Sequence, residues 1–262
     1  MARITVLMGI YNCDSTLVEA LDSLYAQTFQ DFKIVLCEDG STDSTYEVAK
    51  SYAEVHDNII LIRNEHNMGL NYTLNRCLEY ADTEYCARMD GDDISIPTRF
   101  EKQIEFLDEH SEFAIVSTPM IYFDEHGEFR RGVIRNQYPT KYDFIQGTPF
   151  CHAPSMVRTV AYKSVDGYTE DKRLLRVEDY HLWFKMYAAG YKGAILNEHL
   201  YKMRDDRAAI QRRTYRNRIN EAYVKLIGYK MLGLAWYYKF YALRPLIVGL
   251  LPQWLYNFFH RK

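Results

Sequence analysis

The sequence predicts an α/β fold with a mostly parallel central sheet that helices cover on both faces. Two short, continuous apolar runs, at residues 4–10 and 32–37, are typical of strands buried on both faces. Segments with helical spacing of apolar residues separate such runs, and strands that alternate with helices favour a parallel sheet. Polar residues directly follow the runs, at the carboxyl ends of the strands, where ligands bind in these sheets.

The first 95 residues alternate regularly between strands and helices. Strands are expected at residues 4–10, 32–37, 59–62 and 85–89. Helices are expected at 41–54 and 70–80, and an earlier helix is expected to begin with a capping box formed by Thr16 and Glu19. Because four strands end on one edge of the sheet, their polar ends are expected to converge there.

The pattern changes after residue 95. We expect a helix at 97–108, a strand-like run at 113–123 and helices at 156–165 and 178–189. Aromatic residues recur on one face of the last helix: Tyr180, Trp183, Phe184 and Tyr187. Such a stripe indicates core packing more than ligand binding.

A basic, aromatic helical extension is predicted from residue 212 onward. Residues 202–262 contain 13 Lys and Arg against 3 Asp and Glu, a net charge of +10, so the remainder carries -13. The longest uncharged stretch, 245–259, has 15 residues and two prolines, whereas a membrane span needs about 20. We therefore expect the extension to lie in a membrane interface, with packing on the protein body as the alternative. Its many apolar aromatics fit lipid better than nucleic acid.

Composition bounds the class of protein and its compartment. With 262 residues, 48% of them apolar, the chain has enough apolar side chains for the core of one large domain and is not disordered. Its five cysteines are odd in number and scattered, which indicates free thiols in a reducing compartment. No signal peptide precedes the first strand, so we expect a cytoplasmic protein at the inner face of the cell membrane.

The acidic turn, Asp90-Gly91-Asp92-Asp93, follows the fourth predicted strand and places three carboxylates within four residues. These groups repel one another unless a positive charge lies among them. Hard oxygen ligands suit Mg²⁺ or Mn²⁺, which takes its other ligands from water and from phosphates of a substrate. The alternative is a solvated acidic turn, since Asp and Gly favour turns. Arg88 and Arg99 flank this turn and could neutralise it through ion pairs.

Five motifs in order carry a resemblance to a known family. They are residues 6–12, 38–43, 67–75, 89–99 and 177–183. Together, over residues 3–205, they resemble the family 2 inverting glycosyltransferases of the GT-A fold, of the kind found in bacterial polysaccharide biosynthesis. The resemblance implies a Rossmann-like GT-A domain at 1–210, with a nucleotide-binding half at 1–95 and an acceptor half at 96–210. The helical extension then occupies 211–262.

The resemblance implies a donor site for a nucleotide-diphosphate sugar, with UDP favoured. Residues implied in donor binding are Met8, Tyr11, Asp39, Asn67, Gly69, Asp90 and Arg204. A tyrosine ring suits base stacking, and an aspartate accepts the imino hydrogen of uracil. Asp92, with Asp90, would hold Mn²⁺ or Mg²⁺, which stabilises the charge that develops on the leaving diphosphate.

The resemblance also implies a catalytic base. Asp179 matches it, with Glu178 beside it, and adjacent carboxylates can raise one pKa towards a value useful for a base. The alternative is a plain helix start, where acidic residues favour the macrodipole. His152 and Trp183 are candidates for the acceptor side, although a lone histidine is as often structural.

Two departures from the family pattern affect the donor site. Many relatives carry Tyr-Arg-x-His and serines after the last strand, whereas residues 201–207 contain neither His nor Ser, so Arg204 or Arg207 would take over diphosphate binding. Leu74 stands where many relatives carry Arg, which puts the donor contact there in doubt.

The function expected is transfer of a sugar to a saccharide acceptor linked to a lipid. The alternatives are a glycosyltransferase-like scaffold without activity and a sugar-nucleotide pyrophosphorylase. A pyrophosphorylase needs a glycine-rich, basic loop after the first strand, and this sequence does not have one there. A dehydrogenase is disfavoured because no GxGxxG follows a strand.

Overall fold

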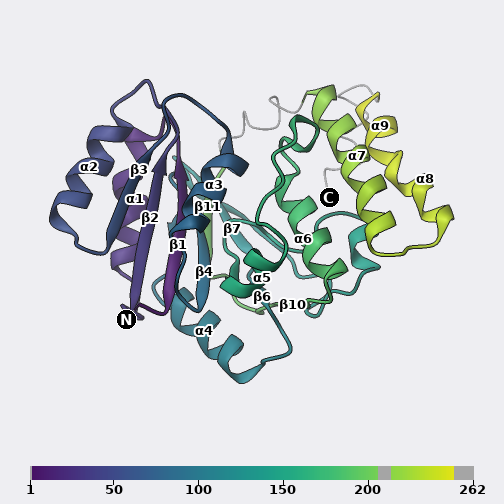
Figure 1. Cartoon of the computed structure of the whole chain (residues 1–262), viewed down its shortest axis with the longest axis horizontal. Helices are drawn as coiled ribbons and strands as arrows, with labels where there is room; N and C mark the ends of the chain where they lie inside the picture. Colours follow the sequence, from purple (N-terminus) through teal and green to yellow (C-terminus); the bar gives the residue numbers. More distant parts are fainter. Residues whose placement is uncertain (1, 206–213, 251–262) are drawn as a thin grey trace.

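A computed structural model describes residues 2–205 and 214–250, and its core is a seven-stranded sheet (Figure 1). The strand order is β10-β6-β9-β4-β1-β2-β3. Its strands are β1 (Ile4–Ile10), β2 (Phe32–Glu38), β3 (Ile59–Arg63), β4 (Tyr85–Asp90), β6 (Ile115–Ser117), β9 (Met156–Arg158) and β10 (Gly193–Ile195). All pairings are parallel except those of β9, so the predicted fold class is confirmed.

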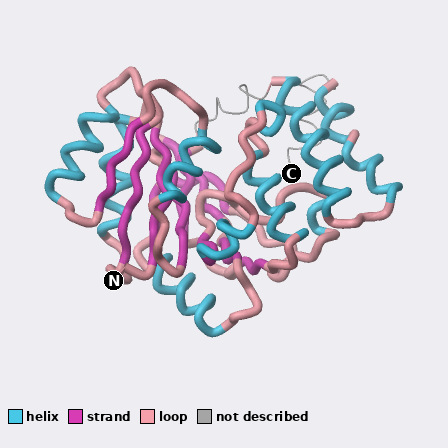
Figure 2. The backbone as a smooth tube through the Cα atoms, in the orientation of Figure 1, coloured by secondary structure: helices cyan, strands magenta, loops and turns pink. Residues whose placement is uncertain are grey.

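Side chains of the central strands alternate between two apolar layers, as the two-residue period of a strand requires. Val6 and Met8 pack towards α1 (Asp14–Tyr25) and α4 (Arg99–Glu109) on one face. Leu7 packs on the other face, towards α3 (Leu70–Glu79), α5 (Thr159–Ser164) and α6 (Glu178–Ala188). The helix α2 (Thr45–Val55) lies against α1 and β3. Figure 2 shows the sheet between these helical layers.

A smaller sheet lies next to the acidic turn. It has the order β5-β11-β7-β8. Its strands are β5 (Ile94–Ser95), β11 (Tyr201–Arg204), β7 (Met120–Asp124) and β8 (Gly127–Arg131). Because β5 directly follows the acidic turn and pairs with β11, it brings Arg204 to that turn.

Three local predictions are wrong. Residues 156–165 were expected to form one helix, but 156–158 form β9, between β4 and β6, before α5 begins. The run at 113–123 divides at Pro119, which lacks an amide hydrogen, into β6 of the large sheet and β7 of the small one. The first helix begins at Asp14 with Cys13 at its N-cap, so Thr16 and Glu19 do not form a capping box.

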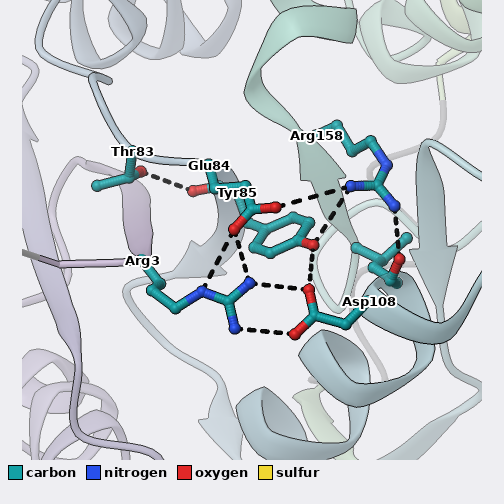
Figure 3. A network of polar contacts seen from close by, with 7 residues as sticks. Arg3, Thr83, Glu84, Tyr85, Asp108 and Arg158 are labelled. Atoms are coloured by element: carbon teal, nitrogen blue, oxygen red, sulfur yellow. Dashed lines mark hydrogen bonds and ion pairs between the residues drawn. The ribbon is translucent and has the colours of Figure 1, made fainter. Parts of the chain in front are cut away.

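A polar network closes the opposite end of the strands from the acidic turn (Figure 3). Arg3 donates to Asp108 at 2.8 Å and to Glu84 at 2.6 Å, and Asp108 also accepts from the Tyr85 hydroxyl at 2.6 Å. Arg158 of β9 reaches the same hydroxyl at 3.3 Å. These contacts join the starts of β1 and β4 to α4 and β9, which leaves the carboxyl ends free to carry a site.

The C-terminal helices pack beside α6 (Figure 1). They comprise α7 (Tyr215–Met231), α8 (Lys239–Ala242) and α9 (Arg244–Gly249), with a 3₁₀ turn, η4 (Trp236–Tyr238), between the first two. Within 2–205 and 214–250, no helix has the length and apolar character needed to cross a bilayer. The predicted helical extension is therefore present from 215 to 250, while Arg207, 211–213 and 251–262 lie outside the described residues.

Candidate active site

A pocket of about 340 Å³ lies at the carboxyl ends of β1 and β4. It is lined by Gly9, Ile10, Tyr11, Asn12, Cys13, Ser15, Thr16, Asp90, Gly91, Asp92 and Arg204. The structure thus brings together four of the residues predicted for the donor and metal: Tyr11, Asp90, Asp92 and Arg204. The convergence expected from parallel strands accounts for this, because β1 and β4 are neighbours and end side by side.

The end of β1 is fixed by the loop that follows β2. Asn12 adopts a left-handed conformation, with φ +47°. Its amide donates to Ser41 Oγ at 3.0 Å, and its side-chain oxygen accepts from the amide of Thr42 at 2.9 Å. Tyr11, the residue before Asn12, is 45% exposed and lines the pocket. The exposed ring is available for stacking on a flat ligand.

Asp39, Asn67 and Gly69 form a second cluster, next to this loop. The buried Asp39 carboxylate accepts from the Asn64 side chain at 2.7 Å and from the amides of Met68 and Gly69 at 2.8 and 3.0 Å. Gly69 caps α3 with φ +90°, a conformation that favours glycine. The side chain of Asn67 is exposed beside these two residues. None of the three lines the pocket, and Asp39 already has three donors.

Met8 lies one layer below the pocket. Its side chain is fully buried in the core between the sheet and the α1–α4 layer. The predicted donor contact by Met8 therefore has no exposed side-chain surface behind it. The family resemblance that implied Met8 does not show which face of the strand is packed, so its donor contact stays a prediction.

The acidic turn is balanced in part by arginine. Asp90 is about one-third exposed and forms an ion pair with Arg88, whose guanidinium is fully buried. Asp93 is buried and accepts from the amide of Arg204 at 2.8 Å. Arg99 does not pair with the turn as predicted, since its guanidinium donates to the carbonyl of Arg88 at 2.7 Å and to Gln103 at 3.1 Å. Arg99 therefore stabilises β4 through its bond to the Arg88 carbonyl.

Asp92 is exposed in the pocket, although protein atoms crowd the space around its carboxylate. Loss of water around it, followed by the charge of Asp90, raises the pKa of its carboxyl. Burial, Asp90 and Asp92 likewise raise the pKa of Asp93 well above its usual range. Gly91 lets the turn approach α1, because a Cβ here would lie 2.8 Å from Cys13 Sγ. At Asp92, burial and the repulsion from Asp90 therefore outweigh the opposing effect of Arg204 and Arg88.

These carboxylates suit a divalent cation. Asp90 and Asp92 line one pocket, raise each other's electrostatic energy, and offer the oxygen ligands that Mg²⁺ and Mn²⁺ prefer. Among residues 2–205 and 214–250, no group of three or more His, Cys, Asp and Glu is arranged to bind a metal without help. Within those residues, Asp90 and Asp92 would supply two carboxylates, and water and a bound phosphate would complete the coordination.

Arg204 closes the pocket from β11. Its side-chain Nε donates to the carbonyl of Asp92 at 2.9 Å, and its terminal nitrogen forms an ion pair with Glu19 on α1. The guanidinium also lies over the ring of Phe123, 4.5 Å from its centroid. Arg204 therefore lies beside the acidic turn, where a point charge could contact a diphosphate.

The acidic pair, Glu178 and Asp179, forms the first turn of α6. Burial, followed by the charge of Glu178, raises the pKa of Asp179 to about 7. Burial also raises the pKa of Glu178. The Arg88 guanidinium opposes the shift of Asp179, which places the acidic pair within the electrostatic reach of the residue that binds Asp90. Asp179 thus has the pKa of a group that accepts protons at neutral pH.

The acceptor-side candidates have different surroundings. His152 Nε2 lies 2.7 Å from the Tyr168 hydroxyl, and burial, with the charge of Arg88, lowers the pKa of His152 well below its usual range. It is therefore neutral at pH 7. Trp183 is fully buried and packs edge-on against Phe150, with 5.6 Å between ring centroids. The prediction that the aromatic stripe is core is confirmed. Trp183 also lies edge-on to His152, with 6.1 Å between ring centroids, and its acceptor-side role stays a prediction.

Comparison with known proteins identifies the family. The profile of glycosyl transferase family 2 matches residues 5–165, more than half of the chain. The chain belongs to glycosyl transferase family 2. The predicted resemblance is confirmed, and with it the assignment to the transferases and not to the pyrophosphorylases. The matched residues contain both strand ends that form the pocket, whereas the acidic pair lies beyond them.

Several relatives of this family 2 glycosyltransferase cover most of its length. EpsE of Bacillus subtilis (strain 168), named as a glycosyltransferase, is 40% identical over 261 residues, which are 99% of this chain and 94% of that protein. The amylovoran biosynthesis glycosyltransferase AmsE of Erwinia amylovora is 34% identical over 76% of this chain and 75% of its own. WfaP of Escherichia coli, named as a UDP-Glc:alpha-D-GlcNAc-diphosphoundecaprenol beta-1,3-glucosyltransferase, is 26% identical over 75% of each chain.

Solved structures agree with the GT-A fold. TarS of S. aureus, residues 1–349, in complex with UDP, matches with a TM-score of 0.71 at 20% identity, over 95% of this chain and 71% of that one. The mannosyltransferase PcManGT from Pyrobaculum calidifontis, in complex with GDP-Man and Mn²⁺, matches with a TM-score of 0.65 at 20% identity, over 95% of this chain and 74% of its own. The predicted GT-A fold is confirmed.

Asn75 has a structural role that the sequence did not predict. Its side chain donates to the carbonyl of Tyr168 and accepts from the amide of the same residue, both at 2.8 Å. Leu74, where many relatives carry Arg, is fully buried beside it. In this glycosyltransferase the asparagine of α3 thus holds the segment that carries Tyr168, the partner of His152. A contact between residues 93 positions apart leaves no local sequence signal.

Proposed function

We propose that this protein is a metal-dependent, inverting glycosyltransferase. It moves a sugar from a UDP-sugar to a lipid-linked saccharide at the cytoplasmic face of the cell membrane, in the biosynthesis of a cell-surface polysaccharide. Residues 1–95 bind the donor and residues 96–210 the acceptor, with 211–262 as an extension that docks on the membrane. The observation that carries the catalytic part is Asp179, with its pKa of about 7, near the pocket that holds the acidic turn.

The donor occupies the pocket between β1 and β4. Tyr11 stacks on the base, and Asp39, Asn67 and Gly69 shape the wall beside it. Asp90 and Asp92 hold Mn²⁺ or Mg²⁺, which stabilises negative charge on the departing diphosphate. Arg204 adds a positive charge from the other side of the same pocket. The complexes of TarS with UDP and of PcManGT with GDP-Man and Mn²⁺ support this class of donor and this cofactor.

Asp179 takes the proton of the attacking acceptor hydroxyl, and Glu178 keeps its pKa high enough for that task. In a single displacement the acceptor oxygen bonds to C1 of the sugar as the bond from C1 to the diphosphate breaks, and the configuration at C1 inverts. The hydroxyl passes its proton to the Asp179 carboxylate as it attacks. Its oxygen becomes the glycosidic oxygen of the product, and Asp179 becomes protonated. The neutral His152, on its hydrogen bond to Tyr168, lies on the acceptor side.

The acceptor class is supported by relatives. WfaP is named for a diphosphoundecaprenol-linked acceptor, and AmsE for the biosynthesis of amylovoran, so a lipid-linked saccharide in polysaccharide assembly is the class that we assign here. Exposed aromatic residues on the C-terminal helices support a membrane location. Trp236 and Phe240 are 71% and 65% exposed, and Lys239 lies between them. Aromatic and basic side chains favour the headgroup region of an anionic bilayer.

A thermal-shift panel tests the donor site. UDP, GDP, CDP and dTDP are each added with and without Mn²⁺ to the wild type and to Asp92→Asn. A ligand that binds only the folded state raises the Tm. We expect UDP to raise it in the wild type only when Mn²⁺ is present, with no such rise in Asp92→Asn. If no nucleotide raises the Tm under any condition, the donor site does not work and the scaffold alternative replaces the enzyme.

Liposome sedimentation tests the membrane location. Substitution of both Trp236 and Phe240 by Ser is expected to lower partitioning of the full chain onto phosphatidylglycerol vesicles at least fivefold. Val133→Ser is the control, because Val133 is 87% exposed but lies far along the chain from these helices. Equal partitioning of the double variant and the wild type would remove the membrane from the proposal.

A further inference from the structure

The loop that leads into the acidic pair is held by the C-terminal extension. This loop, residues 166–177, runs from α5 to α6 and contains a 3₁₀ turn, η2 (Lys172–Leu174). It lies beyond residues 5–165, the part that matches the family profile. Figure 1 shows α7 alongside α6, and α7 also contacts η2. The segment that sets the position of Asp179 thus rests on an element outside the matched region.

The last turn of this loop has an unfavourable backbone conformation. Arg176, two residues before Glu178, adopts φ +68°, in the left-handed region. A side chain with a Cβ is disfavoured there, and Arg has no short polar group that would compensate. Such a conformation persists only where neighbouring contacts fix it. Those contacts are found on the residues immediately before Arg176.

Asn220 of α7 supplies the most direct of these contacts. It is 2% exposed, and its side-chain amide donates to the carbonyl of Leu175 at 3.0 Å. One turn further along α7, the ring of Tyr223 lies under the guanidinium of Arg173, with 4.6 Å between the ring centroid and Cζ. The chain is therefore held at residues 173 and 175, next to the left-handed Arg176.

The helix α7 is itself fixed on the body of the protein. Gly228 lies so close to Phe184 of α6 that a Cβ at this glycine would come within 2.3 Å of the ring. The Tyr229 hydroxyl donates to the carbonyl of Ile145 at 2.8 Å. Because α7 contacts both α6 and the loop, it can transmit a defined position from one to the other.

We propose that Asn220 is a positioning residue for Asp179. By binding the Leu175 carbonyl, it holds Arg176 in the left-handed conformation and so sets the direction in which α6 begins. Without this bond, Arg176 relaxes to a more favourable conformation and the first turn of α6, with its carboxylates, rotates away from the acceptor. The inference rests on the proposed function for its catalytic consequence, but the bond and the backbone conformation do not depend on it.

Steady-state kinetics of the full chain test this inference. The readout is release of nucleoside diphosphate by donor hydrolysis, in which water takes the sugar in place of the saccharide hydroxyl. UDP-glucose, UDP-N-acetylglucosamine and GDP-mannose are tested with Mn²⁺, and the donor that the wild type turns over fastest is used. Asn220→Asp keeps the shape but loses the donating NH₂ group, and Asn220→Ala is the second variant should the first fail to fold. We expect kcat to fall at least tenfold while KM for the donor stays within twofold. Asn217→Ala is the control, because Asn217 is on the same helix and its side chain forms no hydrogen bond to a residue that the structure describes.

A rescue variant separates positioning from general stability. Glycine adopts φ +68° without strain. Arg176→Gly in the Asn220→Ala background is therefore expected to restore kcat at least threefold, while Arg176→Gly alone changes it less than threefold. Hydrogen exchange supplies a readout that needs no activity, because amides 177–180 should exchange at least tenfold faster in Asn220→Ala than in Asn217→Ala.

Two results would overturn the inference. One is a kcat in both Asn220 variants within twofold of Asn217→Ala, and the other is unchanged exchange at amides 177–180. If the wild type releases no nucleotide from any of the donors, the proposed function fails, and the exchange comparison still decides whether Asn220 holds the loop.

Discussion

The acidic turn at 90–93 and the acidic pair at 178–179 both present clustered carboxylates, but in different surroundings. Asp90 faces a pocket and has the buried Arg88 as its ion-pair partner. Asp179 starts a helix, and within the described parts of the chain neither it nor Glu178 forms an ion pair. Burial, followed by the charge of Glu178, raises the pKa of Asp179 to about 7, whereas the turn places three carboxylates beside a buried arginine. The acidic turn is suited to bind a cation, and the acidic pair is suited to accept a proton.

This comparison explains why two groups of carboxylates can serve one reaction. Carboxylates that lie beside an arginine and line a pocket offer oxygen ligands to a cation and to the phosphates bound to it. A carboxylate that is desolvated and next to another one becomes a base of useful strength. The sequence pattern alone does not separate these outcomes, because both depend on what is packed around the carboxylates.

The largest effect is expected from Asp179→Asn. Loss of the proton acceptor should lower sugar transfer by about 10³-fold, within the range for general-base catalysis, while UDP binding stays within twofold. Nucleotide release and isothermal titration with UDP measure the two quantities. Asp31→Asn, at the start of β2 and at the other end of the sheet, is the matched control. A variant with full transfer activity would remove Asp179 from its role.

The pH dependence of the wild type should follow the acidic pair. Transfer needs ionised Asp179, so kcat/KM should fall as pH falls below about 7, by about tenfold per pH unit. Glu178→Gln removes the second cause of the raised pKa, and its acidic limb should move to lower pH. A profile that is flat between pH 5 and pH 8, or a limb that does not move in Glu178→Gln, would contradict the assignment.

Tyr11→Ala sharpens the comparison on the donor side. Loss of a stacking ring should weaken UDP binding by about fivefold, since such aromatic contacts contribute about 1 kcal/mol. Tyr138→Ala is the control, because Tyr138 is 50% exposed but lines no part of the pocket. Both are compared by titration with UDP and Mn²⁺. Equal affinity of the two variants would place the base elsewhere.

The smallest effect is one of stability. The folded-state pKa of Asp179 lies above the unfolded value of 3.8, so its ionisation disfavours folding, and this cost appears as pH rises from 3.8 to about 7. Asp179→Asn removes it, and the free energy of unfolding should rise by about 1 to 3 kcal/mol at pH 8. The gain should be smaller at pH 5. Chemical denaturation at both pH values measures it, and a loss of stability at pH 8 would be inconsistent with a costly buried carboxylate.

The donor side was largely predictable from sequence. Apolar runs of strand length locate β1 and β4, and parallel pairing brings their ends together, so Tyr11 and Asp90 meet by topology alone. The sequence does not reveal which of three adjacent carboxylates takes Arg88 as partner, because all of them lie within reach along the chain. It also does not show that the Met8 side chain is fully buried, and the donor contact of Met8 stays a prediction.

The acceptor side was less predictable because its contacts span long stretches of chain. The strand β9 has three residues, too few to show a period, and was expected to be part of a helix. The bond from Asn220 to Leu175 joins residues 45 positions apart, and Asn75 reaches Tyr168 across 93. Neither asparagine belongs to an apolar pattern. Such contacts depend on the packing of complete helices, which the local sequence does not determine.

Isothermal titration of UDP tests the division between the two acidic sites most directly. UDP is titrated into the wild type, Asp92→Asn and Asp179→Asn, each with and without Mn²⁺. We expect Mn²⁺-dependent binding in the wild type and in Asp179→Asn, and its loss in Asp92→Asn. Retained Mn²⁺-dependent binding in Asp92→Asn, or its loss in Asp179→Asn alone, would contradict the account in which the turn holds the cation and the pair takes the proton.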